Sequence, residues 1–465
     1  MTDISIEAYY EQSNALNSDI IASQAETKRL LDITTALEEN IDNLDSDAAS
    51  NDIDPNTFNL INHIAFAGTN ALGEELLPSL ETFKDNPNIA IEGIFDKIKQ
   101  LSEVVTNNIS EVGSKLLAKN NLNASFIKST AARLEEKVDE VQHKEYKKNF
   151  TLFSYKPLVS RNKPITTKEQ LFSAMEHDTA FLNNLFEVTD KEVHNFDKMV
   201  RKTIVSLSGV NYMEQMVENY RVLHDFVNST THKASFHQSG KSIAGNEFIS
   251  DTLIGGKTIV INAPGSIITT DSTRGEIRER LSKFDISVVN NLEISGDKTI
   301  TLQNFTVNDL IKFNKLAQDH IKMMSRFNDS LIKNIALIRS LFSIIDKGYY
   351  TGLGAGSGLI MTDSFFNAFK GILISAGRTA PGAVKRVLFT TSGGLVGGAV
   401  GYAIGSIRIW VLKQITGWLS TTIKMQYVIT DMLYKTSNII SDLNIETAQF
   451  NKNMIEQLTK KSNFE

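Results

Sequence analysis

The chain has 465 residues and no cysteine, which excludes disulfide bonds and thiolate metal sites. Hydrophobic residues account for 41% of it, enough for more than one core, and the small number of prolines, 7, permits long helices. The formal net charge of −6 is unevenly spread, because residues 1–60 hold 13 acidic side chains against Lys28 and Arg29. The first residues are acidic and lack the apolar segment of a secretory signal, so we expect synthesis in a cytoplasm.

Residues 1–145 form an acidic region in which we expect several helices. Apolar residues at three- and four-residue spacings predict an amphipathic helix over 13–44. Pro55 after Asp54 predicts the start of a second helix, through about 76, and two more are expected over 89–119 and 123–144. The first 60 residues are either a solvated acidic coil, a segment that masks a basic region elsewhere, or a segment that is later removed.

Residues 146–165 form the predicted linker. Its aromatic side chains, Tyr146, Phe150, Phe153 and Tyr155, stand among lysines and an arginine. The pattern is typical of an extended connector held in place by its aromatic residues. The alternative is a surface on which single-stranded nucleic acid stacks.

Helices are expected to resume over 166–245 and to form a bundle. Thr166 with Glu169, and Thr189 with Glu192, have the spacing of capping boxes, in which the two side chains bond free amides at the start of a helix. Each pair therefore predicts a helix start, and helix is expected to continue to about residue 228.

The sequence pattern changes between residues 246 and 305. Short runs of β-branched residues at 257–261, 266–270, 285–289 and 298–302 alternate with glycine-containing turns and predict a small sheet. A helix is expected within it, over 274–283. We interpret 246–305 as a small β-containing insertion.

The region 306–465 is predicted to contain two long helices on either side of a glycine-rich apolar hairpin, 350–412. Thr306 and Asp309 form a capping-box pattern that begins the first helix, to about 346, and the second covers about 415–459. Residues 387–407 carry no charge, and glycines recur there with a four-residue period: Gly393, Gly394, Gly397, Gly398, Gly401 and Gly405. On a helix these glycines form a ridge nearly free of side chains. The ridge either packs closely against another helix or enters a membrane, since a segment of this length spans roughly 31 Å.

Positive charge surrounds this hairpin. No acidic residue occurs from 364 to 430, whereas the hairpin has a basic flank composed of Arg378, Lys385, Arg386, Arg408 and Lys413. Such a segment suits an anionic lipid surface or nucleic acid.

No catalytic constellation can be assembled from the sequence. Residues 239–242 (SGKS) and 255–258 (GGKT) look like the end of a phosphate-binding loop but lack its earlier glycine, so both predict turns. Residues 176–178 (EHD) are expected to be solvent-exposed on a helix. We therefore expect no enzyme activity, no cofactor and no metal.

One local pattern points to a family. Residues 77–83 (LPSLETF), followed by 89–98 (IAIEGIFDKI) and a long helix, resemble the amino-terminal regions of internal head proteins of large tailed bacteriophages. The resemblance covers about the first 145 residues and does not include the glycine hairpin. It implies a virion protein packed with the genome inside the capsid, sometimes delivered into the host with DNA. It also implies trimming by a head-maturation protease that favours a small residue, any residue, then glutamate. Ala36-Leu37-Glu38 matches that pattern, as do residues 79–81 (SLE).

These features predict a mainly α-helical, elongated, non-enzymatic virion protein with a small β-containing insertion and a glycine-rich helical hairpin. The expected partners are other virion proteins, packaged DNA, the host membrane and further copies of the chain. Two alternatives stay open. One is an all-helical pore-forming toxin, since such toxins also carry an apolar hairpin between long helices. The other is a phage scaffold or tail-associated assembly protein whose hairpin is part of the core.

Overall fold

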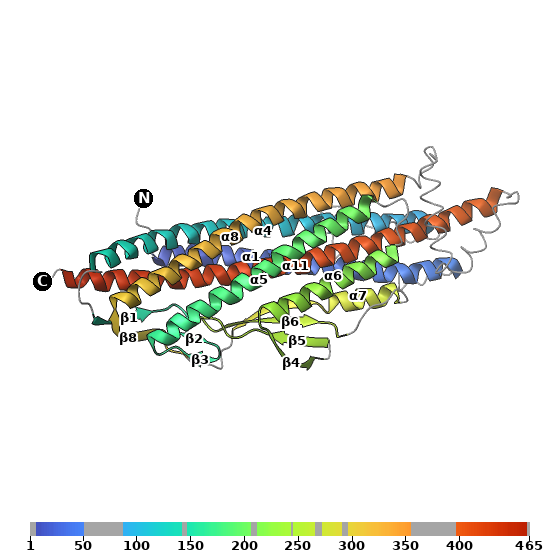
Figure 1. Ribbon diagram of the computed structural model, residues 1–465. Helices are drawn as coiled ribbons and strands as arrows, with labels where there is room; N and C mark the ends of the chain where they lie inside the picture. The colour runs from blue at the N-terminus through green and yellow to red at the C-terminus, as the bar shows by residue number, and fades with distance from the viewer. Residues whose placement is uncertain are drawn as a thin grey trace.

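A computed structural model describes residues 6–50, 87–141, 147–205, 212–242, 245–265, 272–290, 296–354 and 397–462. The helices lie along an elongated rod, with the β elements on one side of it (Figure 1). The prediction of a mainly helical chain with small β elements is confirmed. The helices are α1 (Ile6–Ser50), α4 (Pro87–Val141), α5 (Lys168–Val205), α6 (Tyr212–Lys233), α7 (Arg274–Ser282), α8 (Val307–Gly354) and α11 (Gly397–Ser462).

α11 is the central helix of the rod. It has 66 residues, which corresponds to about 100 Å of helix. Every residue from 420 to 451 is buried or half-buried, because α1, α4, α5, α6 and α8 all pack against this helix. α1, α4, α8 and α11 alternate in direction along the rod, so α8 ends and α11 begins at the same end (Figure 1).

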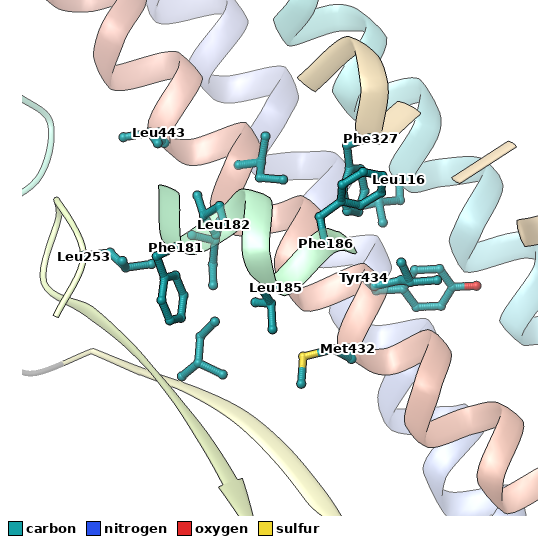
Figure 2. Packing of buried hydrophobic residues seen from close by; sticks show 14 of the residues in the cluster. Leu116, Phe181, Leu182, Leu185, Phe186, Leu253, Phe327, Met432, Tyr434 and Leu443 are labelled. Carbon is teal, nitrogen blue, oxygen red and sulfur yellow. The ribbon is translucent and has the colours of Figure 1, made fainter. Parts of the chain in front are cut away.

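The apolar core lies between α11 and its neighbours. Figure 2 shows Leu182 and Leu185 of α5 beside α11, whereas Phe181 points toward Leu253 and Phe186 toward Phe327. Phe186 packs against Phe327 of α8, with ring centroids 5.3 Å apart. Burial of such side chains provides the main apolar driving force for assembling the rod.

The strands in the described ranges form three small antiparallel sheets. β1 (Lys147–Phe153) pairs with β8 (Thr299–Thr306), and β2 (Val159–Ser160) pairs with β3 (Lys163–Pro164). The largest sheet has the order β4-β5-β6-β7, with β4 (His237–Ser242), β5 (Gly245–Ile249), β6 (Lys257–Ala263) and β7 (Asp285–Asn290). α7 lies between β6 and β7 in sequence, and Thr273 forms a capping box with Glu276 at its start.

The predicted linker and insertion boundaries need correction. The first half of 146–165 is β1, in which Phe150 is buried against Phe305, with ring centroids 5.3 Å apart. That burial removes the ring from any surface for nucleic acid. The predicted strand at 298–302 belongs to β8 and pairs with β1, whereas the four-stranded sheet already begins at His237. The β region is therefore two units, and the insertion sheet covers 237–290; the run at 266–270 lies outside the described residues.

Several helix boundaries also differ from expectation. The two helices predicted over 89–119 and 123–144 are one continuous helix, α4. The capping box before α5 uses Thr167 and Gln170, one residue beyond the predicted pair. Thr189 lies inside α5, where its hydroxyl donates to the carbonyl of Leu185 at 2.7 Å and begins no helix. The box of Thr306 with Asp309 is confirmed, with both bonds present at 2.8 and 3.3 Å.

The glycine-rich hairpin is described only in its second part. Gly397, Gly398, Gly401, Gly405, Arg408 and Lys413 lie in α11, which joins the predicted second limb and the last predicted helix into one. Gly393, Gly394, Arg378, Lys385 and Arg386 lie outside the described residues, as does the helix predicted over 54–76. Within the described ranges, no helix combines the length and apolar character needed to cross a bilayer. Residues 387–396 of the uncharged stretch lie outside those ranges, so the membrane prediction stays a prediction.

Candidate functional site

The most unusual feature of the rod is a row of polar side chains on its central helix. Seven residues of α11 at spacings of three, four or seven form this row, which we term the polar ladder: Asp431, Lys435, Asn438, Asp442, Glu446, Asn453 and Gln457. Such spacing places them on one face of the helix. A polar face of this kind is normally directed to water, whereas here it is directed to the β elements and to α4.

Asp442 is the centre of the ladder. Its carboxylate accepts from Lys156 Nζ at 2.7 Å and also contacts Lys257 Nζ. Lys156 follows β1, and Lys257 is the first residue of β6. Both ammonium groups are mostly buried, with 24% and 17% of the side chain exposed. One carboxylate therefore joins the two separate β units to the central helix.

A third lysine approaches the same centre from α4. Lys119 is almost completely buried, and its Nζ donates to Asn17 at 3.2 Å and to Asn438 at 3.0 Å. Burial lowers the pKa of Lys119 to about 8, against the attraction of Asp442. Lys119 thus loses part of its charge within the physiological pH range.

Asp442 and the three lysines shift one another's pKa values, since Asp442 favours the charged lysines and the lysines repel one another. Burial opposes ionisation of Asp442, but Lys156, Lys257 and Lys119 outweigh it and hold the pKa of Asp442 well below its usual value. Burial likewise opposes the charge on Lys156, and Asp442 reverses that effect, so the pKa of Lys156 is raised. Burial prevails at Lys257, whose pKa is lowered. The cluster is held together by charges that are individually costly to bury.

The carboxyl-terminal half of the ladder bonds the backbone of β1. Asn453 Oδ1 accepts from the amide of Phe153 at 2.7 Å. Gln457 accepts from the amide of Thr151 at 2.9 Å and donates to its carbonyl at 2.6 Å. Just after β1, Glu446 accepts from the Ser154 hydroxyl at 2.7 Å and from the amide of Tyr155 at 3.2 Å. β8 pairs with one edge of β1, and the side chains of Asn453 and Gln457 bond the backbone groups of the other edge, as a neighbouring strand would.

A second polar row of α11 faces α4 and α8. Asn120 and Asn123 of α4 donate to Ser437 and Ser441, both of which are completely buried. His320 of α8 contacts Thr447 Oγ1 at 3.0 Å. These buried polar pairs explain why α4 continues through the residues at which the sequence predicted a break. They also specify the alignment of the helices, the best-attested use of buried polar groups in bundles.

The predicted processing residues Ala36, Leu37 and Glu38 lie inside α1. Leu37 and Glu38 are completely buried, and Glu38 forms an ion pair with Arg278 of α7 at 3.2 Å. A protease needs an extended and accessible segment, so the folded rod does not offer this bond for cleavage. The alternative that the acidic segment is an unstructured coil is wrong for residues 6–50, which are helical.

The residues 176–178 were expected to be exposed, and this holds only for Glu176, because His177 is half-buried and Asp178 is buried. Asp178 is 1% exposed, and its carboxylate accepts from the amide of Ile254 at 2.7 Å and contacts His177 Nδ1 at 3.1 Å. The phosphate-loop lookalike at 255–258 begins in a turn, where Gly255 and Gly256 have φ of 91° and 76°. The other, 239–242, lies in β4 and is no turn. No group of three His, Asp or Glu residues in the described ranges is arranged to hold a metal ion.

Comparisons with known proteins give no relative. No protein-family model, no curated protein and no solved structure matches this chain. The residues of the family resemblance that the structure describes, 89–98, lie in the first turns of α4, and Ile94, Phe95 and Ile98 are buried there. Their spacing is explained by packing in the core.

Proposed function

We propose that the chain is a non-enzymatic structural protein of a tailed-bacteriophage virion, carried inside the head and released with the DNA. The observation that carries the proposal is the organisation of the rod around α11. One helix of about 100 Å is surrounded by the other helices, and the polar groups of its ladder bond other parts of the same chain. Such an arrangement suits a protein whose role is mechanical, and the pattern at residues 77–98 supports placing it in a phage head.

The buried polar groups also suit a rod that comes apart during release. Unfolding returns buried amides, hydroxyls and ammonium groups to water, which recovers the solvation that they lost on folding. Several of these groups, Asn120, Asn123, Asn444 and Asn451 among them, leave one side-chain oxygen unbonded within the described part of the chain. A core of this kind is less resistant to unfolding than an apolar core of equal size.

Mass spectrometry of purified particles tests the proposal. The particles are those of the virus that encodes the chain, purified on a density gradient. We expect peptides from α4 and α11 in a constant ratio to the major capsid protein across the gradient. Protease added to intact particles should leave the chain uncut, whereas protease added after osmotic opening should degrade it. If the chain stays in the particle-free fraction, or is cut in intact particles, the proposal of an internal virion protein is wrong.

The processing proposal has its own readout in the same particles. Cleavage after Glu38 removes seven acidic and two basic residues and changes the formal charge from −6 to −1, which favours residence beside DNA. Because Leu37 and Glu38 are buried in the folded rod, we propose that any cleavage precedes the packing of α1. Amino-terminal sequencing is expected to find Glu39 as the first residue. If sequencing finds Met1 or Thr2 as the first residue, the processing proposal is wrong and α1 is kept in the mature particle.

A pore-forming protein is the second candidate, favoured by one observation. α8 ends and α11 begins at the same end of the rod, and the sequence that connects them contains residues 387–396 of the uncharged stretch 387–407. The test is dye release from vesicles by the full-length protein. A pore former is expected to release dye from vesicles with anionic lipid, less so from neutral ones or at high salt. A variant with Arg408→Gln and Lys413→Gln should lose part of the preference for anionic lipid. Absence of release from either vesicle type rejects this candidate.

A further inference from the structure

Four titratable side chains meet where the four-stranded sheet contacts α5. His177 and Asp178 are neighbours on α5, Asp251 follows β5, and His237 begins β4. His177 Nδ1 lies 3.1 Å from Asp178 Oδ1, and His177 Nε2 lies 3.5 Å from Asp251 Oδ2. The second oxygen of Asp251 lies 3.1 Å from His237 Nε2. We name these four residues the His177 clasp.

The chemistry of the imidazole ring decides which protonation state fits this arrangement. A neutral imidazole has one N–H, whereas the imidazolium has two. Each ring nitrogen of His177 faces a carboxylate, and an ionised carboxylate only accepts hydrogen bonds. The neutral ring therefore satisfies one of the two carboxylates and turns a lone pair toward the other. Only protonated His177 carries the charge that attracts both carboxylates, through a hydrogen bond to Asp178 and an ion-pair contact with Asp251.

The position of the ring is fixed by its surroundings. His177 stacks on Phe181 at 6.4 Å between ring centroids, and Phe181 in turn packs on Phe236. Asp178 is held by the amide of Ile254 at 2.7 Å. The ring thus lies between a rigid carboxylate on α5 and a half-exposed one, Asp251, on the sheet side.

We propose that protonated His177 fastens the loop after β5 and the adjoining end of β4 to α5, and that this clasp loosens as the pH rises. The proposal is independent of the virion function. The charged groups that face His177 are Asp178 of α5, Asp251 of the sheet and Arg161 of the β2–β3 turn. Arg161 disfavours the protonated ring and the two carboxylates favour it. The bond to Asp178 is the largest influence, and it raises the pKa of His177 against the effect of burial.

The direction of the pH dependence follows from that raised pKa. A histidine whose pKa is higher in the folded protein than in the unfolded chain adds stability that is fully present below the unfolded pKa. The contribution is lost as the pH rises through the folded pKa. The loop around Asp251 should therefore be tightly docked in mild acid and more mobile in mild alkali. Lys156, whose pKa is raised, keeps its contact with Asp442 as the pH rises, so the sheet side of the rod stays attached to α11.

Two measurements test the clasp, both in the presence of a chelator. Histidine C2 hydrogen exchange, followed by mass spectrometry in the unmodified protein, gives the pKa of each histidine. We expect the pKa of His177 to exceed that of His194, which lies on the same helix and contacts only the carbonyl of Asp190 among the described partners. If the measured pKa of His177 is equal to or below that of His194, the proposal is overturned. This comparison uses the unmodified protein alone.

Amide hydrogen exchange then measures the docking itself. After correction for intrinsic rates, exchange of the segment 250–256 should be roughly fivefold faster at about pH 8.5 than at about pH 6, the factor expected for loss of a partly exposed charge pair. His177→Gln and Asp251→Asn should each abolish this difference, and His194→Gln, the matched control, should keep it. The proposal is overturned if the parent shows no difference, or if both clasp variants fold and retain it.

Discussion

Replacing Asp442 by asparagine is the most direct test of the polar ladder. Asp442→Asn keeps the size of the side chain and removes the charge that opposes Lys156, Lys257 and Lys119. Removing one partner of a buried ion pair costs about 3–5 kcal/mol, because the other charge stays buried and unpaired. The Asp442 side chain is 23% exposed, so water partly compensates, and we expect a loss of about 2–4 kcal/mol in the free energy of unfolding.

Urea unfolding followed by far-ultraviolet circular dichroism measures this loss. The matched control is Glu111→Gln, which breaks the exposed pair of Glu111 with Lys115, 2.9 Å apart. Exposed pairs of that kind contribute at most about 1 kcal/mol. Adding Lys257→Met to Asp442→Asn removes one uncompensated charge and should restore about 1–2 kcal/mol. If Asp442→Asn costs no more than the control, the reasoning about the buried cluster is refuted.

The stabilisation by Asp442 should decrease in strong acid. The pKa of Asp442 is lowered in the folded protein, so its contribution is present above the unfolded pKa of about 3.9. The contribution is lost as the pH falls through the lower folded value. The difference between parent and Asp442→Asn should therefore shrink in strong acid, and a constant difference down to the acid limit contradicts this assignment.

Three further predictions concern other parts of the rod. Gly113→Ala should destabilise the rod by about 1–2 kcal/mol, because the added Cβ would lie 2.8 Å from Ile335 Cδ1. This steric cost outweighs the better helix propensity of alanine. Thermal unfolding measures the loss of stability. Full burial lowers the pKa of His320 to about 4. The free energy of unfolding should therefore fall by about 3 kcal/mol between about pH 6.5 and pH 4, because the unfolded chain binds a proton at His320 over that range and the folded protein does not. The difference in free energy of unfolding between the parent and His320→Gln should shrink over the same range. The double variant Gly397→Leu and Gly401→Leu should cost on the order of 3 kcal/mol if the glycine ridge contacts a neighbour; unfolding indistinguishable from the parent rejects the ridge as a packing surface.

The control for Gly113→Ala is Gly275→Ala in the first turn of α7. A Cβ at Gly275 would meet only Thr273 Oγ1, at 4.0 Å, so the substitution should be neutral or slightly stabilising. Equal effects at the two positions contradict the steric argument for Gly113.

Helices were predictable from the sequence wherever one face is apolar. The amphipathic pattern over 13–44 is confirmed by α1, and the capping box of Thr306 with Asp309 by the start of α8. The division of α4 into two helices failed because Asn120 and Asn123 look like solvent-exposed residues near a break. They are buried against α11, a tertiary effect that overrides local preference.

The polar ladder illustrates a harder limit. Its residues in α11 have a regular helical spacing, so the row itself is visible in the sequence. A polar row is ordinarily the solvent face of a helix, and the partners Lys156 and Lys257 are distant in sequence. Only the three-dimensional arrangement reveals that Asp442 joins them. The insertion boundary failed for a similar reason, since β8 pairs with β1 across the sequence of α5 and α6.

The ladder gives α11 a single axial position. Its side chains bond particular groups: Asp442 contacts Lys156 and Lys257, Glu446 accepts from Ser154, and Gln457 bonds the backbone of Thr151. A slide by one helical turn, about 5.4 Å, would separate Asp442 from Lys156 and Lys257, and Gln457 from Thr151. A force applied at Gly397 along the axis of α11 would act on all contacts of the polar ladder at once. We therefore expect these contacts to break together, above a threshold force, and not one after another.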